Sequence, residues 1–309
     1  MRGTFVNTLS DMMIRDERII VVTADMGFAT FEALRDKFPK RFINTGVSEA
    51  NAAGVSAGLA MSGYTVFFYA QAEFVTLRCF EQVRLDIASN NLNVKLVGTS
   101  SGYTLGQYGV SHFALEDVAV MRALPNMSIF CPGDLYEAEE ITKLACSFNG
   151  PAYIRIGRSN SAKDVRIHPK LPKINAGEPI TVMEGGGPTI VSTGSMLFLA
   201  KEAADLLRKS GASAKLVSLP TIKPLNEKKI LSLFKNTKSI YVLEEHSAIG
   251  GLGTAIAEIV ADYGLPYRVV RLGTADTFLH TTGSRDYLLS LSGLTPNIIA
   301  DKIKGDARL

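Results

Sequence analysis

The 309-residue chain has no tryptophan and only three cysteines, each within apolar sequence. A small, odd number of cysteines does not make a disulfide framework, so we expect Cys79, Cys131 and Cys146 to be buried free thiols of a cytoplasmic protein. The four histidines are scattered, and none has the spacing to a cysteine or to another histidine that a zinc site requires. The spacing therefore predicts no zinc site in this chain.

Long hydrophobic runs and an excess of charge of one sign are also missing. No apolar run approaches the roughly 20 residues that span a bilayer, and the start, MRGTFVNTLSDMMIRDERII, lacks the charged segment and apolar core of a signal peptide. The 33 Lys and Arg residues nearly balance the 30 Asp and Glu residues. This balance argues against nucleic acid or a membrane surface as a partner.

The chain does contain an alternation of short β-branched runs with helical stretches. Strands are predicted at 19–25, 65–70, 94–100, 128–132 and 152–157, and again at 188–194, 214–219, 238–245 and 267–273. Helices are predicted at 78–88, 113–124, 196–210 and 252–263. The alternation predicts parallel sheets covered by helices, in two α/β domains at 1–160 and 181–309. The polar segment 161–180 is predicted to be the linker between them.

The run NTGVSEANAAGVSAGLAMSG (44–63) consists mostly of small and apolar residues and contains one acid, Glu49, and no base. The simplest interpretation is that the helix dipole favours an acid in the first helical turn by about 0.3–1 kcal/mol. The second interpretation starts from the small residues, which let another backbone approach closely and would bury Glu49. A buried carboxyl needs a partner, and burial without one favours its protonated form.

Six segments follow one another in an order that chance does not produce. The first four are TGVSEANAAGVSAGLAMSG, EFVTLRCFEQVRLDIA, GVSHFALEDVAVMRALPNMSIFCPGD and GPAYIRIGRS; together they resemble the pyrimidine-binding domain of transketolases and their thiamine diphosphate relatives. The last two, STGSMLFLAKEAADLL and YVLEEHSAIGGLGTAIAEI, resemble the C-terminal domain of the same family. The resemblance covers essentially the whole chain. It implies a thiamine diphosphate pyrimidine-binding parallel-sheet domain followed by a transketolase C-terminal-like α/β domain.

The same resemblance exposes a missing part. Full-length transketolases carry a preceding domain that binds the cofactor diphosphate through Mg²⁺ and is marked by a G-D-G motif, and no G-D-G occurs in this chain. The resemblance therefore implies the C-terminal subunit of a split transketolase, with Mg²⁺ bound by a separate N-terminal subunit and no metal ligand in this chain. It also implies an α₂β₂ assembly in which copies of this chain associate and the sites form between subunits.

The resemblance assigns the cofactor side of the site to four residues. The acid matching Glu49 hydrogen-bonds a ring nitrogen of the aminopyrimidine and favours the imino tautomer, which removes the thiazolium proton. Phe74 is the candidate aromatic platform for the pyrimidine, with strand or helix core as the alternative, and Arg78 is a candidate pocket-lining residue. Asp25, at a predicted strand end, matches an acid near the cofactor, and a helix N-cap is the alternative for it.

The resemblance assigns five further residues to the substrate side. His112 matches a histidine that contacts substrate hydroxyls and stabilises charge on the intermediate; a structural histidine is the alternative. Arg158 and Arg2 match positions that hold the substrate phosphate, for which a planar guanidinium is suited because it bonds two oxygens at once. Ser100 stands where a histidine is usual, and Tyr108 where an acid contacts an acceptor hydroxyl. These two departures predict an altered specificity among sugar phosphate substrates.

The predicted activity is transfer of a two-carbon ketol unit from a ketose phosphate to an aldose acceptor, using thiamine diphosphate. The nearest alternative is the β-subunit of a 2-oxo-acid dehydrogenase, which shares both domains; RALPNM (122–127) and Arg158 favour transketolase. A 1-deoxyxylulose-phosphate synthase is normally a single longer chain. A third alternative is a non-catalytic subunit that only binds and regulates a true transketolase. The presence of Glu49 and His112 argues against it, because such a subunit would need neither residue.

Overall fold

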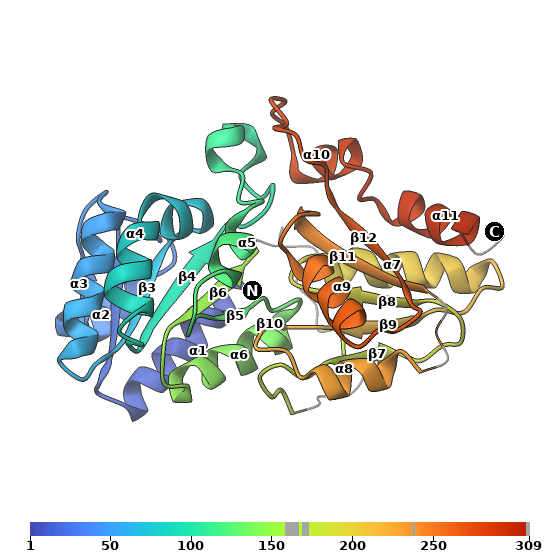
Figure 1. The fold of residues 1–309 in the computed structure, drawn as a ribbon. Coiled ribbons are helices and arrows are strands. Elements are labelled where there is room, and N and C mark those ends of the chain that lie inside the picture. The colour runs from blue at the N-terminus through green and yellow to red at the C-terminus, as the bar shows by residue number, and fades with distance from the viewer. Residues whose placement is uncertain (158–166, 169–172, 236, 238, 307–309) are drawn as a thin grey trace.

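The computed structural model describes residues 1–157, 167–168, 173–235, 237 and 239–306. Arg158, predicted to hold substrate phosphate, lies outside the described residues. Two sheets lie next to each other, and helices cover both faces of each (Figure 1). Among the described residues, no helix combines the length and the apolar character needed to cross a membrane.

The first sheet has seven strands in the order β10-β5-β6-β4-β3-β1-β2. Six of them come from the first half of the chain: β1 (Ile19–Thr23), β2 (Phe42–Asn44), β3 (Thr65–Gln71), β4 (Val94–Thr99), β5 (Ser128–Phe130) and β6 (Ala152–Ile156). These six are parallel, and most of their residues are buried because helices cover both faces. Their carboxyl ends share one edge, where sites of α/β sheets usually form.

Helices cover the two faces of this sheet unequally. α1 (Arg2–Arg15) and α6 (Leu135–Ser147) pack together on one face. α3 (Glu49–Met61), α5 (Asp117–Arg122) and the segment 74–88 cover the other face. The short helix α2 and three 3-10 connections complete this half: α2 (Glu32–Lys37), η1 (Pro39–Arg41), η4 (Gly106–Tyr108) and η5 (Val110–His112).

Two predicted helices differ from the structure. The stretch 78–88 is not one α-helix; it belongs to a π-helical turn η2 (Phe74–Arg78), a single turn α4 (Phe80–Gln82) and a second π-helical turn η3 (Val83–Ala88). Such wider turns are frequent at functional sites. The helix predicted at 113–124 is reduced to α5, because Ala114 instead pairs with Gly102 through two backbone hydrogen bonds of 3.1 and 3.2 Å.

The second sheet has the order β12-β11-β8-β9-β7, with only the edge strand β7 antiparallel. Its strands are β7 (Ile180–Met183), β8 (Thr189–Ser192), β9 (Lys215–Ser218), β11 (Ser239–Ser247) and β12 (Arg268–Thr274). Its helices are α7 (Met196–Lys209), α8 (Glu227–Leu233), α9 (Leu252–Asp262), α10 (Arg285–Leu291) and α11 (Pro296–Asp306). α7 and α11 pack on one face and α9 on the other.

The two halves of the chain are joined by a shared sheet and a shared apolar cluster. β10 (Thr221–Lys223), from the second half, pairs antiparallel with β5 and so extends the first sheet. One apolar cluster runs from Val22 and Val66 in the first sheet to Val217 and Val242 in the second. The predicted α/β fold is confirmed, while the domain limits at 160 and 181 stay predictions.

The three cysteines are free thiols. Cys79 and Cys131 are buried, as predicted, whereas Cys146 near the end of α6 is only partly buried.

Candidate functional site

Glu49 is the first residue of α3, and its side chain is only 3% exposed. Its Oε2 accepts a 3.0 Å hydrogen bond from Nη1 of Arg78, which lies 29 residues further along the chain. The buried carboxyl therefore has a partner, a cation that η2 supplies. The helix-dipole interpretation does not account for this burial either.

The Phe74 ring provides the second contact of Arg78. The guanidinium carbon lies 3.7 Å from the ring centroid, so the planar cation stacks on the aromatic face. Phe74 is half-buried, while the Arg78 side chain is 47% exposed. The π-helical turn that contains both residues thus holds a ring and a guanidinium against each other beside the acid of α3.

His112 extends this group toward the loop that follows β4. Its ring lies 5.3 Å from the Phe74 ring, edge to face, and 4.9 Å from the Tyr108 ring. Its Nδ1 is 2.9 Å from Oγ of Ser111. Burial, and then the positive charge of Arg78, lower the pKa of His112 below its ordinary value. The imidazole is therefore mainly neutral at pH 7 and can both donate and accept a hydrogen bond.

Five residues predicted from the sequence consequently form one continuous series of contacts. In spatial order they are Glu49, Arg78, Phe74, His112 and Tyr108. We call this series the site cluster.

Asp25 is not part of the site cluster. It follows β1 with a left-handed backbone (φ 55°) and exchanges two hydrogen bonds of 2.9 Å with Asn44 at the end of β2. Because α2 begins only at Glu32, the helix N-cap alternative for Asp25 is wrong. Asp25 and Asn44 line a cavity of about 140 Å³ at the carboxyl ends of β1 and β2.

Ser100 and Arg2 are also outside the site cluster. Ser100 follows β4, is buried, and has a left-handed backbone (φ 59°). Arg2 begins α1, and the buried Met1 before it lies close to Gly157, the residue preceding Arg158. In the part of the chain that the structure describes, no hydrogen bond or ion pair joins Asp25, Ser100 or Arg2 to the site cluster.

Both halves of the chain match models of known families. Residues 1–163 match the transketolase pyrimidine-binding domain, and residues 180–299 match the transketolase C-terminal domain. This chain belongs to the transketolase family.

Three curated transketolase-family relatives match nearly the whole chain. A putative transketolase C-terminal section from Methanocaldococcus jannaschii is 36% identical over 98% of this chain and 95% of its own length. One of the subunits of an apulose-4-phosphate transketolase from Phocaeicola vulgatus is 34% identical over 87% of this chain and 86% of its own length. A 6-deoxy-6-sulfo-D-fructose transketolase subunit from a Clostridium species is 35% identical over 96% of this chain and 90% of its own length.

A solved transketolase structure has the same fold over the full length. It is described as a split-gene transketolase in an inactive β4 tetramer, and it superposes with a TM-score of 0.88 at 34% identity over 98% of this chain and 97% of that one. Membership of the transketolase family implies dependence on thiamine diphosphate.

The loop that carries Tyr108 and His112 is held in place by residues from the second half of this transketolase chain. The sequence analysis did not predict these contacts. Glu245 of β11 accepts a 2.9 Å hydrogen bond from the backbone nitrogen of Tyr103, and Arg285 of α10 holds the same carboxylate through bonds of 2.6 to 3.1 Å. Gly283 donates from its backbone to the carbonyl of Gly106 at 3.1 Å. An acid and a base 40 residues apart leave no local pattern, so only the tertiary structure reveals this clamp.

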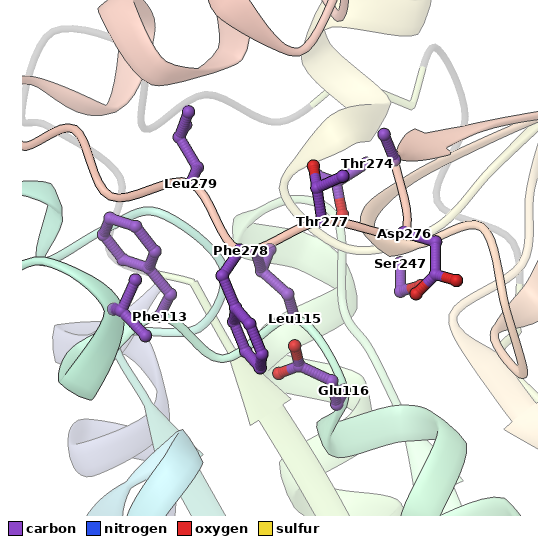
Figure 2. A pocket seen from close by; sticks show the side chains of 11 residues that line it. Phe113, Leu115, Glu116, Ser247, Thr274, Asp276, Thr277, Phe278 and Leu279 are labelled. Carbon is purple, nitrogen blue, oxygen red and sulfur yellow. The ribbon is translucent and has the colours of Figure 1, made fainter.

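A cavity of about 160 Å³ lies where that loop meets the segment after β12. Figure 2 shows Phe278 between Phe113 on one side and Glu116 on the other, with Asp276 at the far end. The Phe278 side chain is 71% exposed. The cavity adjoins the site cluster through Phe113, the neighbour of His112.

Asp134, Glu137 and His168 form a separate buried group whose ligand atoms lie within 4.8 Å of one another. Each carboxylate oxygen already accepts at least one hydrogen bond from the protein, including one of 2.7 Å from Nε2 of His168 and one of 2.6 Å from Ser218. Protein donors alone therefore satisfy these two buried acids.

Proposed function

We propose that this chain is the C-terminal subunit of a split transketolase. Together with a separate N-terminal subunit and thiamine diphosphate, it transfers a two-carbon ketol unit from a ketose phosphate to an aldose acceptor. The observation that carries the proposal is the site cluster, in which Arg78 joins an acid to an aromatic ring and that ring contacts a neutral imidazole. The split-subunit relatives, each matched over most of its length, support it.

The contacts of Arg78 indicate how the site cluster fits the aminopyrimidine of the cofactor. The guanidinium is flat, donates an N–H group to Glu49 and stacks on Phe74. An aminopyrimidine is also flat and would need the same two contacts, a hydrogen bond to the acid and a ring to stack on. Arg78 would have to turn aside toward solvent, and its 47% exposure leaves room for that.

Each residue of the site cluster then has a defined task. The carbanion chemistry is supplied by thiamine diphosphate. Glu49 is buried at the start of α3 and, once Arg78 has turned aside, is placed to hydrogen-bond a ring nitrogen of the pyrimidine. Phe74 fixes the plane of the ring. His112, neutral at pH 7, donates to or accepts from the substrate oxygen on which charge develops.

The surface around the site cluster supports the proposed partners, an N-terminal subunit that holds Mg²⁺ and the diphosphate, and a second copy of this chain. On α3, Gly54 and Gly58 have open space where a side chain would stand, and Met61 is 74% exposed. Val47 (74%) and Leu77 (44%) are exposed apolar neighbours of Glu49 and Arg78. A smooth, apolar surface of this kind favours close packing of another chain. The β4 tetramer of the solved relative supports self-association.

The direct test of the proposal is an activity assay on the two subunits together. The chain is purified with a G-D-G-containing subunit, and the complex is assayed for ketol transfer from a ketose phosphate and, in parallel, for 2-oxo-acid decarboxylation with a lipoyl acceptor. Transfer dependent on thiamine diphosphate and Mg²⁺ supports the proposal. Decarboxylation with reductive acylation of the lipoyl group, and no ketol transfer, would show a 2-oxo-acid dehydrogenase subunit instead.

The acceptor specificity is proposed to depend on Tyr108. Its ring lies 4.9 Å from that of His112 and is 59% exposed, so it adds uncharged volume where other transketolases place an acid. An acid that receives a hydrogen bond from a hydroxyl of the acceptor sugar discriminates strongly against sugars that lack this hydroxyl, because they leave the buried charge unpaired.

We expect weak activity with ribose 5-phosphate and better activity with an acceptor that is smaller, deoxygenated or branched beside the aldehyde. Tyr108→Asp should raise kcat/KM for ribose 5-phosphate relative to the deoxygenated acceptor by about tenfold or more. Tyr108→Phe, which keeps the ring and removes only the hydroxyl, is the control and should leave that ratio nearly unchanged. If ribose 5-phosphate is already the best acceptor and Tyr108→Asp changes nothing, specificity is set elsewhere.

A further inference from the structure

Glu73 is a buried acid to which the proposed chemistry gives no role. It directly precedes Phe74 at the start of η2, just after the carboxyl end of β3. It is only 4% exposed, and neither of its carboxyl oxygens has a hydrogen-bond partner among the residues that the structure describes. A charged carboxylate in that position would be strongly destabilising.

The charges around Glu73 are mostly negative. Glu49 approaches from α3 and Asp117 from α5, and both oppose its ionisation; Arg78, on the same turn, favours it. Within the described part of the chain, the other elements that pack against η2 offer no further cation there: β3 and β4 end in the uncharged Gln71 and Thr99. The acid of α4, Glu81, is exposed.

The cations that the structure places beside these acids already have partners. Arg78 is paired with Glu49, and Asp117 is held by Arg155 through bonds of 2.7 and 3.2 Å. Among the described residues, Glu73 is left without a counter-ion of its own.

We propose that Glu73 is kept as a neutral carboxylic acid beneath the site cluster and acts as a positioning residue, leaving the Arg78 guanidinium free to alternate between Glu49 and solvent. Burial raises the pKa of Glu73 to about 8, and the negative charge of Asp117 adds to this effect. The acid is thus mainly protonated at neutral pH. When it ionises, it becomes a second carboxylate that attracts Arg78 and adds a negative charge beside the site of an anionic cofactor and substrate.

The first experiment follows the melting temperature of the full chain, without partner or cofactor, at about pH 6 and about pH 9. A carboxyl whose pKa is higher in the folded than in the unfolded state stabilises the fold at low pH, and this stabilisation is lost as the pH rises through about 8. Wild type should therefore lose more stability than Glu73→Gln between the two pH values, because glutamine does not titrate. The exposed Glu17→Gln is the control and should follow wild type.

A difference between wild type and Glu73→Gln that is the same at both pH values would overturn the proposal. If Glu73→Gln does not fold, Glu73→Met replaces it in the same comparison of melting temperatures, because methionine has a similar volume and no titratable group. This experiment does not depend on the proposed transketolase activity.

The second experiment rests on the proposed function and uses the assembled enzyme. At pH 9 only about one-tenth of a group with a pKa of about 8 is still protonated, so wild-type turnover should fall about tenfold between pH 7 and pH 9. Glu73→Gln should keep most of its turnover over that range. Superimposable pH profiles of the two proteins would rule out the positioning role, whereas absence of ketol transfer in both would contradict only the proposed function.

Discussion

Purified by itself and supplied with thiamine diphosphate and Mg²⁺, this chain is expected to give no measurable ketol transfer. The site cluster offers a hydrogen bond, a stacking surface and an imidazole for the pyrimidine and the substrate. It offers nothing for the diphosphate, because Mg²⁺ requires oxygen ligands together with the phosphates and the chain has no G-D-G motif. The exposed Arg78 and Tyr108 side chains also leave the site open to water.

The measurement compares the chain alone, the G-D-G subunit alone and the mixture in one coupled assay. Only the mixture should show transfer, and its activity should saturate as one subunit is titrated with the other. Calorimetry should show weak binding of thiamine diphosphate to the chain alone; tryptophan fluorescence offers no signal, since this chain has no tryptophan. Ketol transfer by the chain alone at a rate near that of the mixture would mean that it carries a complete site.

The sequence could predict that the central residues of the candidate site belong together, but it could not predict the contacts between them. Glu49, Phe74 and His112 lie in segments whose order identifies the family, and the structure places all three in one cluster. The Glu49–Arg78 pair joins residues 29 positions apart. It depends on a π-helical turn, and apolar spacings of three and four do not distinguish such a turn from an α-helix.

Glu73 shows a second limit of sequence analysis. An acid followed by phenylalanine and valine is typical of an exposed residue on an amphipathic helix. Its burial arises because α3, α5, β3 and β4 all pack around η2. Asp25 and Ser100 follow strands of the first sheet, and their assignment to the site stays a prediction: among the described residues, no hydrogen bond or ion pair joins either of them to the site cluster.

Replacement of Glu49 by glutamine should lower turnover of the assembled enzyme by about 10²–10⁴-fold, the usual contribution of a positioned acid or base. The carbonyl oxygen of glutamine can still accept the hydrogen bond from Arg78, so α3 and η2 should keep their contact. The amide has no acidic proton to hold at the pyrimidine nitrogen. The loss should therefore appear in kcat, with little change in assembly.

Size-exclusion chromatography of the mixed subunits separates this effect from misfolding, since Glu49→Gln should elute with wild type. Glu17→Gln, an exposed acid outside the site cluster, removes the same charge and should keep full turnover. Turnover of Glu49→Gln within a few-fold of wild type would mean that the acid serves only to hold Arg78 against Phe74. In that case Arg78→Met, which removes the other partner of the ion pair, should lower turnover more than Glu49→Gln does. If the proton of Glu49 is required instead, Glu49→Gln should lower turnover more than Arg78→Met.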